Sequence, residues 1–445
     1  MAKQDFLSSM SHDIRTPMNA IIGMTSLAID NANNSGQVQD YLRKIALSSK
    51  HLLGLINDVL DISKIESGKM ALNIEQVSLR EVMDCIVNIM QPQVKAKNQH
   101  FNAVAYEILS EDVRCDSVRL NQVLINLLGN AVKFTPENGS IQAAVYQEAL
   151  PETPSRVRTH FLVSDTGIGM SKEYQKVIFE SFSREDNTRV RKTEGSGLGM
   201  TITKYIVDAM DGDISVRSEQ GKGSEFHVVL DLEKAAEHEM DTVLPCWNVL
   251  VVDGDERLCT NTVHVLESIG VRAEWCVSAE QAMDRIADSR CQLVLLGWKL
   301  PGMNGVEAAR TIQSNFGEDR PATMLMACDW SEIADEAREA GISGFISKPL
   351  FKSTLFDALS AFAGTGVEEA AGAEKAVDLV LRGKHILLAE DNELNWEVAK
   401  EMLAVLEMEL DWVENGQNCV AKFEKSPVGY YDAILMDVRM PIMDG

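Results

Sequence analysis

Three features that would narrow the function are scarce or missing in this chain of 445 residues. No uninterrupted apolar run reaches the ~18–20 residues that a membrane-spanning helix needs, and the first residues contain no apolar signal-peptide core. The eight cysteines are scattered, without a CxxC pair or a Cys/His cluster. This argues against a zinc site and a disulfide framework, and it predicts a reducing, cytoplasmic setting.

Basic charge is also scarce. The chain has 42 Lys and Arg against 67 Asp and Glu, a formal net charge of -25. Such a chain would repel nucleic acid and anionic lipid, so we expect neither as a partner. Hydrophobic residues at 45% and charged residues at 24% are typical of folded domains. At about 100–200 residues per domain, we expect three or four domains.

The first part of the chain predicts two long helices, 2–30 and 38–66, separated by the turn-forming residues NANNSGQ. The second helix repeats apolar residues at helical spacing. Two such helices cannot bury their apolar faces alone, so we expect a dimer that forms a four-helix bundle.

Strands and helices are mixed over 76–233. Apolar segments predict strands at 141–147, 159–166 and 224–232, and amphipathic segments predict helices at 120–134 and 197–210. From 248 onward, short apolar strands alternate with helices, which is typical of a parallel sheet covered on both faces. We predict strands at 248–253, 291–297, 322–327 and 344–349.

This last pattern is an internal repeat. VLVVDGDE matches ILLAEDNE, and LVLLGWKLPGMNG matches AILMDVRMPIMDG. A linker rich in small residues, GTGVEEAAGAEKA, separates the two copies. The second copy ends before its fourth and fifth strands, so we expect it to be truncated.

Two groups of residues carry candidate chemistry in the first half of the chain. On the first helix, Asp13 can orient the imidazole of His12, Thr16 lies one turn on, and Pro17 loosens the helix. Further along, Asn126 and Asn130 lie at i and i+4 on one helix, where two amide oxygens can hold Mg²⁺.

The second group extends into neighbouring segments. Lys133 can meet a phosphate and Phe134 can contact a base. Asp165 can accept a hydrogen bond from an adenine amino group, beside Gly167 and Gly169. The segment Gly195-Ser196-Gly197-Leu198-Gly199 opens a helix whose N–H groups suit phosphates, and the polar residues before it suit a lid.

Residues 7–228 resemble the core of a sensor histidine kinase. LSSMSHDIRTPMNAI resembles the phosphoacceptor box, and NLLGNAVKFTP, DTGIGM, FESFSRED and GSGLGM resemble the nucleotide-binding boxes. The resemblance implies ATP and Mg²⁺ as cofactors, with Phe182 and Leu198 joining the ATP-binding residues above. It also implies phosphoryl transfer to His12 in a homodimer, assisted by Asp13, with Thr16 serving the reverse phosphatase reaction.

The repeats resemble response-regulator receiver domains. In the second copy the resemblance implies a Mg²⁺-binding acidic pair, Glu390 and Asp391, and Asp437 as phosphoacceptor. The first copy departs from the pattern, because Gly254, Gly297 and Met326 replace the second acid, the acceptor and the hydroxyl residue. Since glycine cannot be phosphorylated, we interpret 246–363 as a pseudo-receiver.

The predicted organisation is a multidomain fold. A helical hairpin (1–70), which forms a dimeric four-helix bundle, precedes an α/β sandwich ATPase of the histidine kinase/gyrase type (76–233). Two flavodoxin-like doubly wound α/β receivers follow at 246–363 and 384–445, joined by a linker at 364–383. We expect no sensor domain in this fragment and impaired transfer to Asp437, and a membrane-anchored longer parent stays compatible with the sequence.

Hence we predict a protein-histidine kinase, ATP:protein-L-histidine phosphotransferase, that relays to Asp437 in the intact parent, or to a separate response regulator or histidine phosphotransfer protein. Two alternatives stay open. One is an ATPase of the gyrase, mismatch-repair and chaperone group, but Gln122 stands where those enzymes have a water-activating Glu. The other is a signalling scaffold without catalysis.

Overall fold

The computed structural model describes residues 2–67, 70–180, 197–236, 244–288, 291–317, 320–330, 333–365 and 382–445. Side chains are described from residue 14 onward, apart from those of 66, 364 and 365. The chain divides into two compact units, Met1–Ala363 and Gly364–Gly445. Each unit is described by itself.

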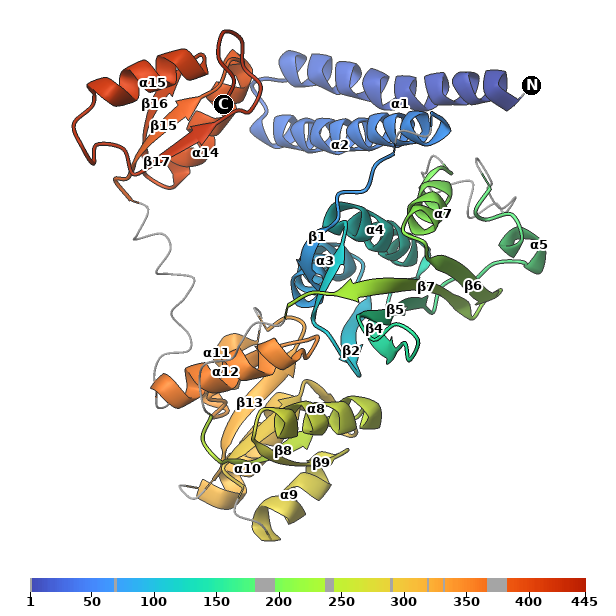
Figure 1. The fold of residues 1–445 in the computed structure, drawn as a ribbon, viewed down its shortest axis with the longest axis vertical. Helices are drawn as coiled ribbons and strands as arrows, with labels where there is room; N and C mark the ends of the chain where they lie inside the picture. Colours follow the sequence, from blue (N-terminus) through green and yellow to red (C-terminus); the bar gives the residue numbers. More distant parts are fainter. Residues whose placement is uncertain are drawn as a thin grey trace. The chain divides into compact units, whose positions relative to one another are not determined.

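The chain starts with a hairpin of two long helices, α1 (Ala2–Asp30) and α2 (Ser35–Glu66), which run side by side (Figure 1). Asn34 caps α2 by accepting a hydrogen bond from the Gln37 N–H, so the helix starts a few residues earlier than predicted. Several apolar side chains of both helices are exposed, Ile22 by 57% and Leu47 by 69% among them. The hairpin therefore leaves an apolar surface uncovered in the single chain.

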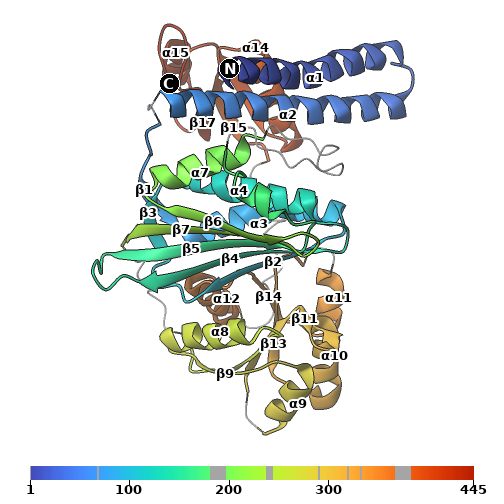
Figure 2. The same ribbon diagram turned by 90° about the vertical axis from the view of Figure 1, so that its right-hand side faces the viewer.

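A two-layer α/β domain follows, built on a seven-stranded sheet in the order β1-β3-β7-β5-β4-β2, with β6 paired to β7. Only β2 and β4 pair in parallel; the other pairs are antiparallel. Helices α3, α4 and α7 cover one face of the sheet (Figure 2). The elements are β1 (Glu75–Ser78), α3 (Leu79–Ala96), β2 (His100–Tyr106), β3 (Asp112–Cys115), α4 (Ser117–Phe134), β4 (Ser140–Ala149), β5 (Arg156–Asp165), α5 (Lys172–Gln175), α7 (Gly199–Ala209), β6 (Asp213–Glu219) and β7 (Gly223–Lys234).

Helix α4 shows why this layer forms. Asp116 caps it by accepting from the Arg119 N–H, and its apolar residues recur at helical spacing and are buried against the sheet: Leu120, Val123, Leu124, Leu127, Leu128, Ala131 and Val132. The three strands and two helices predicted for this region are confirmed. The short strands β1, β3 and β6 and the edge strand β2 were not predicted.

The first receiver-like region is a five-stranded parallel sheet in the order β14-β13-β10-β8-β9. Its four predicted strands are confirmed, and the edge strand β9 was missed. The elements are β8 (Asn248–Val252), α8 (Glu256–Ser268), β9 (Arg272–Cys276), α9 (Ala279–Asp288), β10 (Leu293–Gly297), β11 (Lys299–Leu300), β12 (Met303–Asn304), α10 (Gly305–Phe316), β13 (Ala322–Ala327), α11 (Ala334–Glu339), β14 (Gly344–Ser347) and α12 (Lys352–Thr365).

The second unit repeats the start of this topology. Its three strands are parallel, in the order β16-β15-β17, which corresponds to β9-β8-β10 of the first region. The elements are β15 (His385–Ala389), α14 (Glu393–Val405), β16 (Glu409–Val413), α15 (Gly416–Lys425) and β17 (Ala433–Met436). The edge strand β16 was again not predicted. Most of the expected linker, residues 366–381, lies outside the described residues.

Candidate functional site: nucleotide pocket and two receiver pockets

Helix α4 presents Asn126 and Asn130 toward helix α7. The Asn126 Nδ2 donates to the Thr203 Oγ1 at 2.8 Å, and the Nδ2 atoms of Asn126 and Asn130 lie 3.8 and 3.4 Å from the Met200 Sδ. These contacts use the amide nitrogens of both asparagines. Neither Thr203 nor Met200 was identified from the sequence, since the contact joins two helices far apart in the chain.

Gly199 leaves room for the Asn126 amide. A Cβ at this position would lie 2.4 Å from the Asn126 Oδ1, well inside van der Waals contact. Gly199 also begins α7, after the buried Leu198 and after Gly197 with φ +70°. The N-cap residue Leu198 makes no side-chain capping hydrogen bond, so within the described part of the chain the N–H groups of the first turn of α7 can face an anion.

Asp165 is the last residue of strand β5. Its Oδ1 accepts from the Gly167 N–H at 2.7 Å, and burial raises the pKa of this carboxyl above its usual range. Gly167 and Gly169 lie close to backbone atoms of neighbouring segments, so they are needed for packing within the protein itself. A Cβ on Gly169, with φ +62°, would lie 2.0 Å from the Glu219 carbonyl oxygen, so a side chain there would displace β6.

The loop that follows β5 contacts the last residues of helix α4. The Ile168 N–H donates to the Phe134 carbonyl at 3.3 Å, and a Cβ on Gly167 would lie 2.7 Å from the same oxygen. The Lys133 Nζ lies 5.1 Å from the centre of the Phe134 ring. The structure thus brings the predicted residues of α4, the β5 loop and the start of α7 into one region.

For four predicted site residues the structure describes either no position or no side chain. Phe182 and Gly195 lie outside the described residues, as does the expected lid between them. His12 and Asp13 lie on α1, but their side chains are not described. Thr16 is exposed one turn further on, and Pro17 is buried within the helix.

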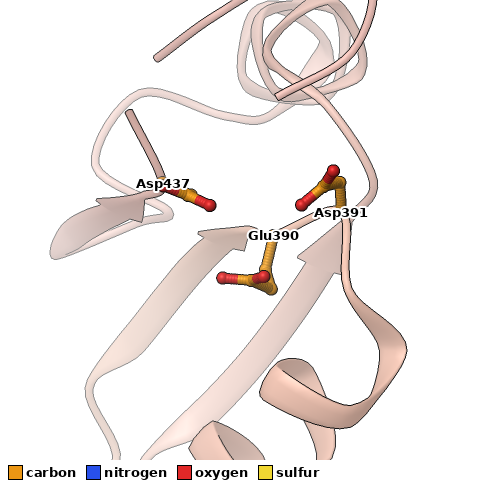
Figure 3. A group of neighbouring side chains, drawn as sticks. All are labelled: Glu390, Asp391 and Asp437. Atoms are coloured by element: carbon orange, nitrogen blue, oxygen red, sulfur yellow. The ribbon is translucent and has the colours of Figure 1, made fainter. Parts of the chain in front are cut away.

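In the second receiver copy, the three predicted acidic residues come together at the ends of β15 and β17 (Figure 3). One carboxylate oxygen from each of Glu390, Asp391 and Asp437 lies within 4.8 Å of the others. Close carboxylates repel one another without a cation, and oxygen ligands suit Mg²⁺. The donor set therefore fits this metal.

Two tryptophans lie beside this acidic cluster. The Trp412 Nε1 donates to the backbone carbonyl of Glu390 at 2.9 Å. The rings of Trp396 and Trp412 stack with 5.2 Å between their centres and 7° between their planes. This contact couples β16 and α14 to the strand end that carries Glu390.

The first receiver copy has a different arrangement at the same strand ends. Asp253 is 5% exposed and pairs with Lys348, whose Nζ lies 2.6 Å from the Asp253 Oδ2. A Cβ on Gly297 would lie 2.3 Å from that same oxygen. Asp255 caps α8 by accepting from the Leu258 N–H. The acids left in this copy thus pair with a lysine and cap a helix.

Three families match successive parts of the chain. The His Kinase A (phospho-acceptor) domain matches residues 2–68, and the Histidine kinase-, DNA gyrase B-, and HSP90-like ATPase matches 115–234. The Response regulator receiver domain matches 249–360 and 386–445. The chain belongs to the hybrid histidine kinases. Its ATPase and receiver folds are those predicted from the sequence.

Similar proteins agree with this family. The Sensor protein GacS of Pseudomonas syringae pv. syringae is 30% identical over 451 residues, covering 100% of this kinase chain and 49% of that protein. The Autoinducer 2 sensor kinase/phosphatase LuxQ of Vibrio vulnificus is 33% identical over 372 residues, covering 81% and 43%. The chain thus spans about half the length of these curated relatives.

A solved structure resembles nearly the whole kinase chain. Full-length ShkA in complex with AMPPNP aligns with a TM-score of 0.60 and 27% identity, covering 98% of this chain and 87% of that one. Among the described helices, none combines the length and apolar character that crossing a membrane requires.

One contact of the kinase core was missed by sequence reasoning. Near the end of α2, Asp61 is buried and accepts from the Arg119 Nη1, with 3.0 Å to each carboxylate oxygen. The Gln122 Nε2 donates to the same carboxylate at 2.8 Å. This cluster joins the helical hairpin to the helix that carries Asn126. The i, i+3 spacing of Arg119 and Gln122 was the only available signal.

Proposed function

We propose that this chain is a protein-histidine kinase that phosphorylates its own His12 from Mg-ATP and passes the phosphoryl group to a receiver aspartate. The observation that carries the proposal is that one chain matches a phospho-acceptor domain at residues 2–68 and an ATPase domain at 115–234. The Asn126 contact with Thr203 of α7 and the Asp165 contact with Gly167 support a nucleotide site formed by these elements.

In the first step, a neutral imidazole nitrogen of His12 attacks the γ-phosphorus of ATP. The new N–P bond forms as the bond from the γ-phosphorus to the bridging oxygen breaks, and ADP leaves with that electron pair. Asp13 would hold the other ring nitrogen and stabilise the positive charge that develops on the ring. Thr16 would position a water for the reverse, hydrolytic reaction, an activity that the name of the relative LuxQ also includes.

The nucleotide pocket supplies position and charge. Asp165 would accept a hydrogen bond from the adenine amino group, and the Asn126 and Asn130 oxygens would hold Mg²⁺, which neutralises phosphate charge when bound. Lys133 would meet a phosphate. Gly197, Leu198 and Gly199 would place the N–H groups of α7 against the phosphates, with Phe182 and Gly195 completing the pocket.

The hairpin is proposed to pair with that of a second copy. Its exposed apolar side chains at Ile22, Leu47 and Leu53 would be removed from water in a four-helix bundle, at about 25 cal/mol per Å² of buried apolar surface. We place the kinase in the cytoplasm, where a response regulator or histidine phosphotransfer protein is its partner.

In the second step, an Asp437 carboxylate oxygen attacks the phosphorus on His12, and the N–P bond breaks. Mg²⁺ held by Glu390, Asp391 and Asp437 would offset the charge that gathers there. The same step can use the aspartate of a separate regulator.

The deciding test uses the whole chain and ATP labelled on the γ-phosphate. We expect label that is stable in base and lost in acid, as for a phosphoramidate, and we expect its absence in His12→Gln. The control is His51→Gln, which changes another histidine of the hairpin and should keep the label. Wild-type protein that never gains such label would refute the proposal.

A second test addresses the pocket through Thr203. Thr203→Val removes the hydroxyl that holds the Asn126 amide, while Thr203→Ser keeps it. We expect Thr203→Val to weaken Mg-ATP binding by about tenfold, the effect of ~1.4 kcal/mol, and Thr203→Ser to bind nearly as wild type. Equal affinities for both variants would show that the hydroxyl does not position Asn126.

The alternatives are less well supported. Gyrase-type hydrolysis needs a carboxylate to activate water, whereas the side chain of Gln122 is an amide that donates to Asp61 and accepts from Arg119. A scaffold without catalysis has no need for the paired amides and uncapped helix of the pocket. Titration with nucleotide would separate a scaffold from a kinase.

A further inference from the structure

Strands β2 and β4 of the ATPase sheet are buried on both faces. Alternate residues, Ala103 and Ala105 on β2 and Ala143 and Val145 on β4, belong to the core beneath the helices. The residues between them belong to a second core on the opposite face: Val104, Tyr106 and Ala144. A two-layer sandwich on its own would leave that second face in water, so these apolar positions need a cover.

The cover consists of residues of the pseudo-receiver. The second core continues from strands β2 and β4 into α8, α12 and the receiver sheet, with these side chains among its fully buried members: Leu258, Leu266, Val251, Leu355 and Leu359. One hydrophobic core therefore belongs to both domains. Its members come from segments more than a hundred residues apart in the sequence.

The backbone edge of the ATPase sheet is covered as well. Strand β2 is an edge strand, and such strands present unpaired N–H and C=O groups. The buried side chain of Asn261 on α8 meets them. Its Oδ1 accepts from the Glu107 N–H at 2.7 Å, and its Nδ2 donates to the Ala105 carbonyl at 3.4 Å. An amide side chain thus replaces a neighbouring strand.

Polar contacts surround the shared core. The Tyr106 Oη donates to the Asp255 Oδ2 at 2.8 Å, and the Arg257 guanidinium lies 4.5 Å from the centre of the Tyr106 ring. At the α12 side, the Arg80 Nη1 donates to the Asp357 Oδ2 at 2.6 Å. Asp255 stands where the second copy has Asn392, and here it contacts the ATPase domain.

We propose that the pseudo-receiver is a fixed third layer of the ATPase domain, docked on the outer face and edge of that domain's sheet in the same chain. In this arrangement the two domains open and move as one body, and Asp255 contributes to docking through its contact with Tyr106. The proposal rests on interdomain contacts and does not depend on the kinase function proposed above.

Hydrogen exchange of the full chain tests this coupling. Val104 points away from the core under the ATPase helices, so Val104→Asp places a charge in the shared core without entering the other one. We expect exchange in residues 100–107 and in α8 to rise together, by about tenfold or more, while α4 stays protected.

Asn102→Asp is the matched control, since Asn102 is an exposed residue of the same strand and face. We expect it to change exchange by less than about twofold in both segments. Faster exchange in 100–107 with unchanged exchange in α8 would refute the proposal, and so would equal effects of the two variants.

A second pair of variants changes the interface less than Val104→Asp does, so it tests the proposal even if Val104→Asp does not fold. Tyr106→Phe and Asp255→Asn each alter the interdomain hydrogen bond without changing side-chain volume greatly. We expect their effects on α8 exchange to be less than additive in the double variant, because both act on one contact. Fully additive effects would show that this contact does not couple the domains.

Discussion

The two receiver copies share a strand order and differ at the strand ends. The second copy gathers three carboxylates there, from Glu390, Asp391 and Asp437. The first copy keeps a single buried carboxylate, Asp253, which is paired with Lys348. Sheet formation depends on the apolar strands, which both copies retain. The shared strand order therefore does not depend on the three carboxylates, because the first copy has it with Gly254 and Gly297 at two of those positions.

The two copies also carry different residues at the position that caps the helix after the first strand. Asp255 of the first copy and Asn392 of the second both cap the following helix by accepting backbone N–H groups. Capping needs only a side-chain oxygen, so either residue serves. Asp255 has an added contact with Tyr106, which a neutral asparagine would make less strongly. The first copy has thus kept an acid for a structural reason.

The largest expected effect comes from breaking the ion pair of the first copy. Lys348→Met leaves Asp253 buried without its cation, which should lower the free energy of unfolding by about 3–5 kcal/mol. Calorimetry of the full chain would show a lower transition temperature. The double variant Asp253→Leu with Lys348→Met is the control, and we expect it to recover most of the loss. A Lys348→Met protein as stable as wild type would contradict this view.

Restoring acids at positions 254 and 297 tests whether these two substitutions account for the difference between the copies. Gly254→Asp has room, since its Cβ would meet the Pro301 Cδ at 3.4 Å, whereas Gly297→Asp requires the Asp253 side chain to move. We expect the double variant to lose about 1–3 kcal/mol without a cation, because like charges are brought together, and to regain stability with Mg²⁺. Stability that Mg²⁺ does not change would show that further residues are required.

Removing an acid from the second copy should lower its affinity for Mg²⁺. Asp437→Asn takes one negative oxygen ligand from the cluster, so Mg²⁺ affinity should fall by about tenfold or more, equivalent to ~1.4 kcal/mol. Isothermal titration would measure it. Asp432→Asn, an acid of the same unit that pairs with Lys384, is the control and should keep wild-type affinity.

The smallest effect concerns pH and the sheet face beside the first copy. His160 stacks on Tyr146, and its Nδ1 lies 2.9 Å from the His227 Nε2, so one of these rings must be neutral for a hydrogen bond to form. Burial lowers the pKa of His160, outweighing Glu148, which raises it, while His227 and Arg158 lower it further. The Arg257 guanidinium of α8 lies 5.5 Å from the Tyr146 ring centre.

Because the pKa of His160 is lower in the folded chain, the unfolded chain protonates this histidine more readily. The free energy of unfolding should therefore fall as pH drops below about 6.5, with a slope of at most ~1.4 kcal/mol per pH unit. Urea unfolding between pH 5 and 8 would measure the slope, which His160→Gln should reduce. A slope unchanged in His160→Gln would assign the pH dependence to other groups.

Part of this molecule could be predicted from the sequence. The apolar period located the hairpin, α4, α7 and the central strands, and the repeat placed Glu390, Asp391 and Asp437 at strand ends that a parallel sheet must align. The edge strands β9 and β16 were missed, because they are short and partly exposed and so lack a continuous apolar run.

Contacts between distant helices could not be predicted in the same way. The Thr203 hydroxyl beside Asn126 and the Asp61 carboxylate beside Arg119 depend on how helices pack, which no local spacing encodes. The shared core was also missed, although the apolar residues at successive positions 103–106 of β2 indicate a strand buried on both faces.

The stacked pair of Trp396 and Trp412 has an optical consequence. All six tryptophans of the chain lie at position 247 or later, so neither the hairpin nor the ATPase domain contributes indole fluorescence. Two nearly parallel indoles at 5.2 Å absorb as a coupled pair, and one of them is bonded to the carbonyl of Glu390. Near-ultraviolet circular dichroism can therefore follow cation binding at the second copy without a label.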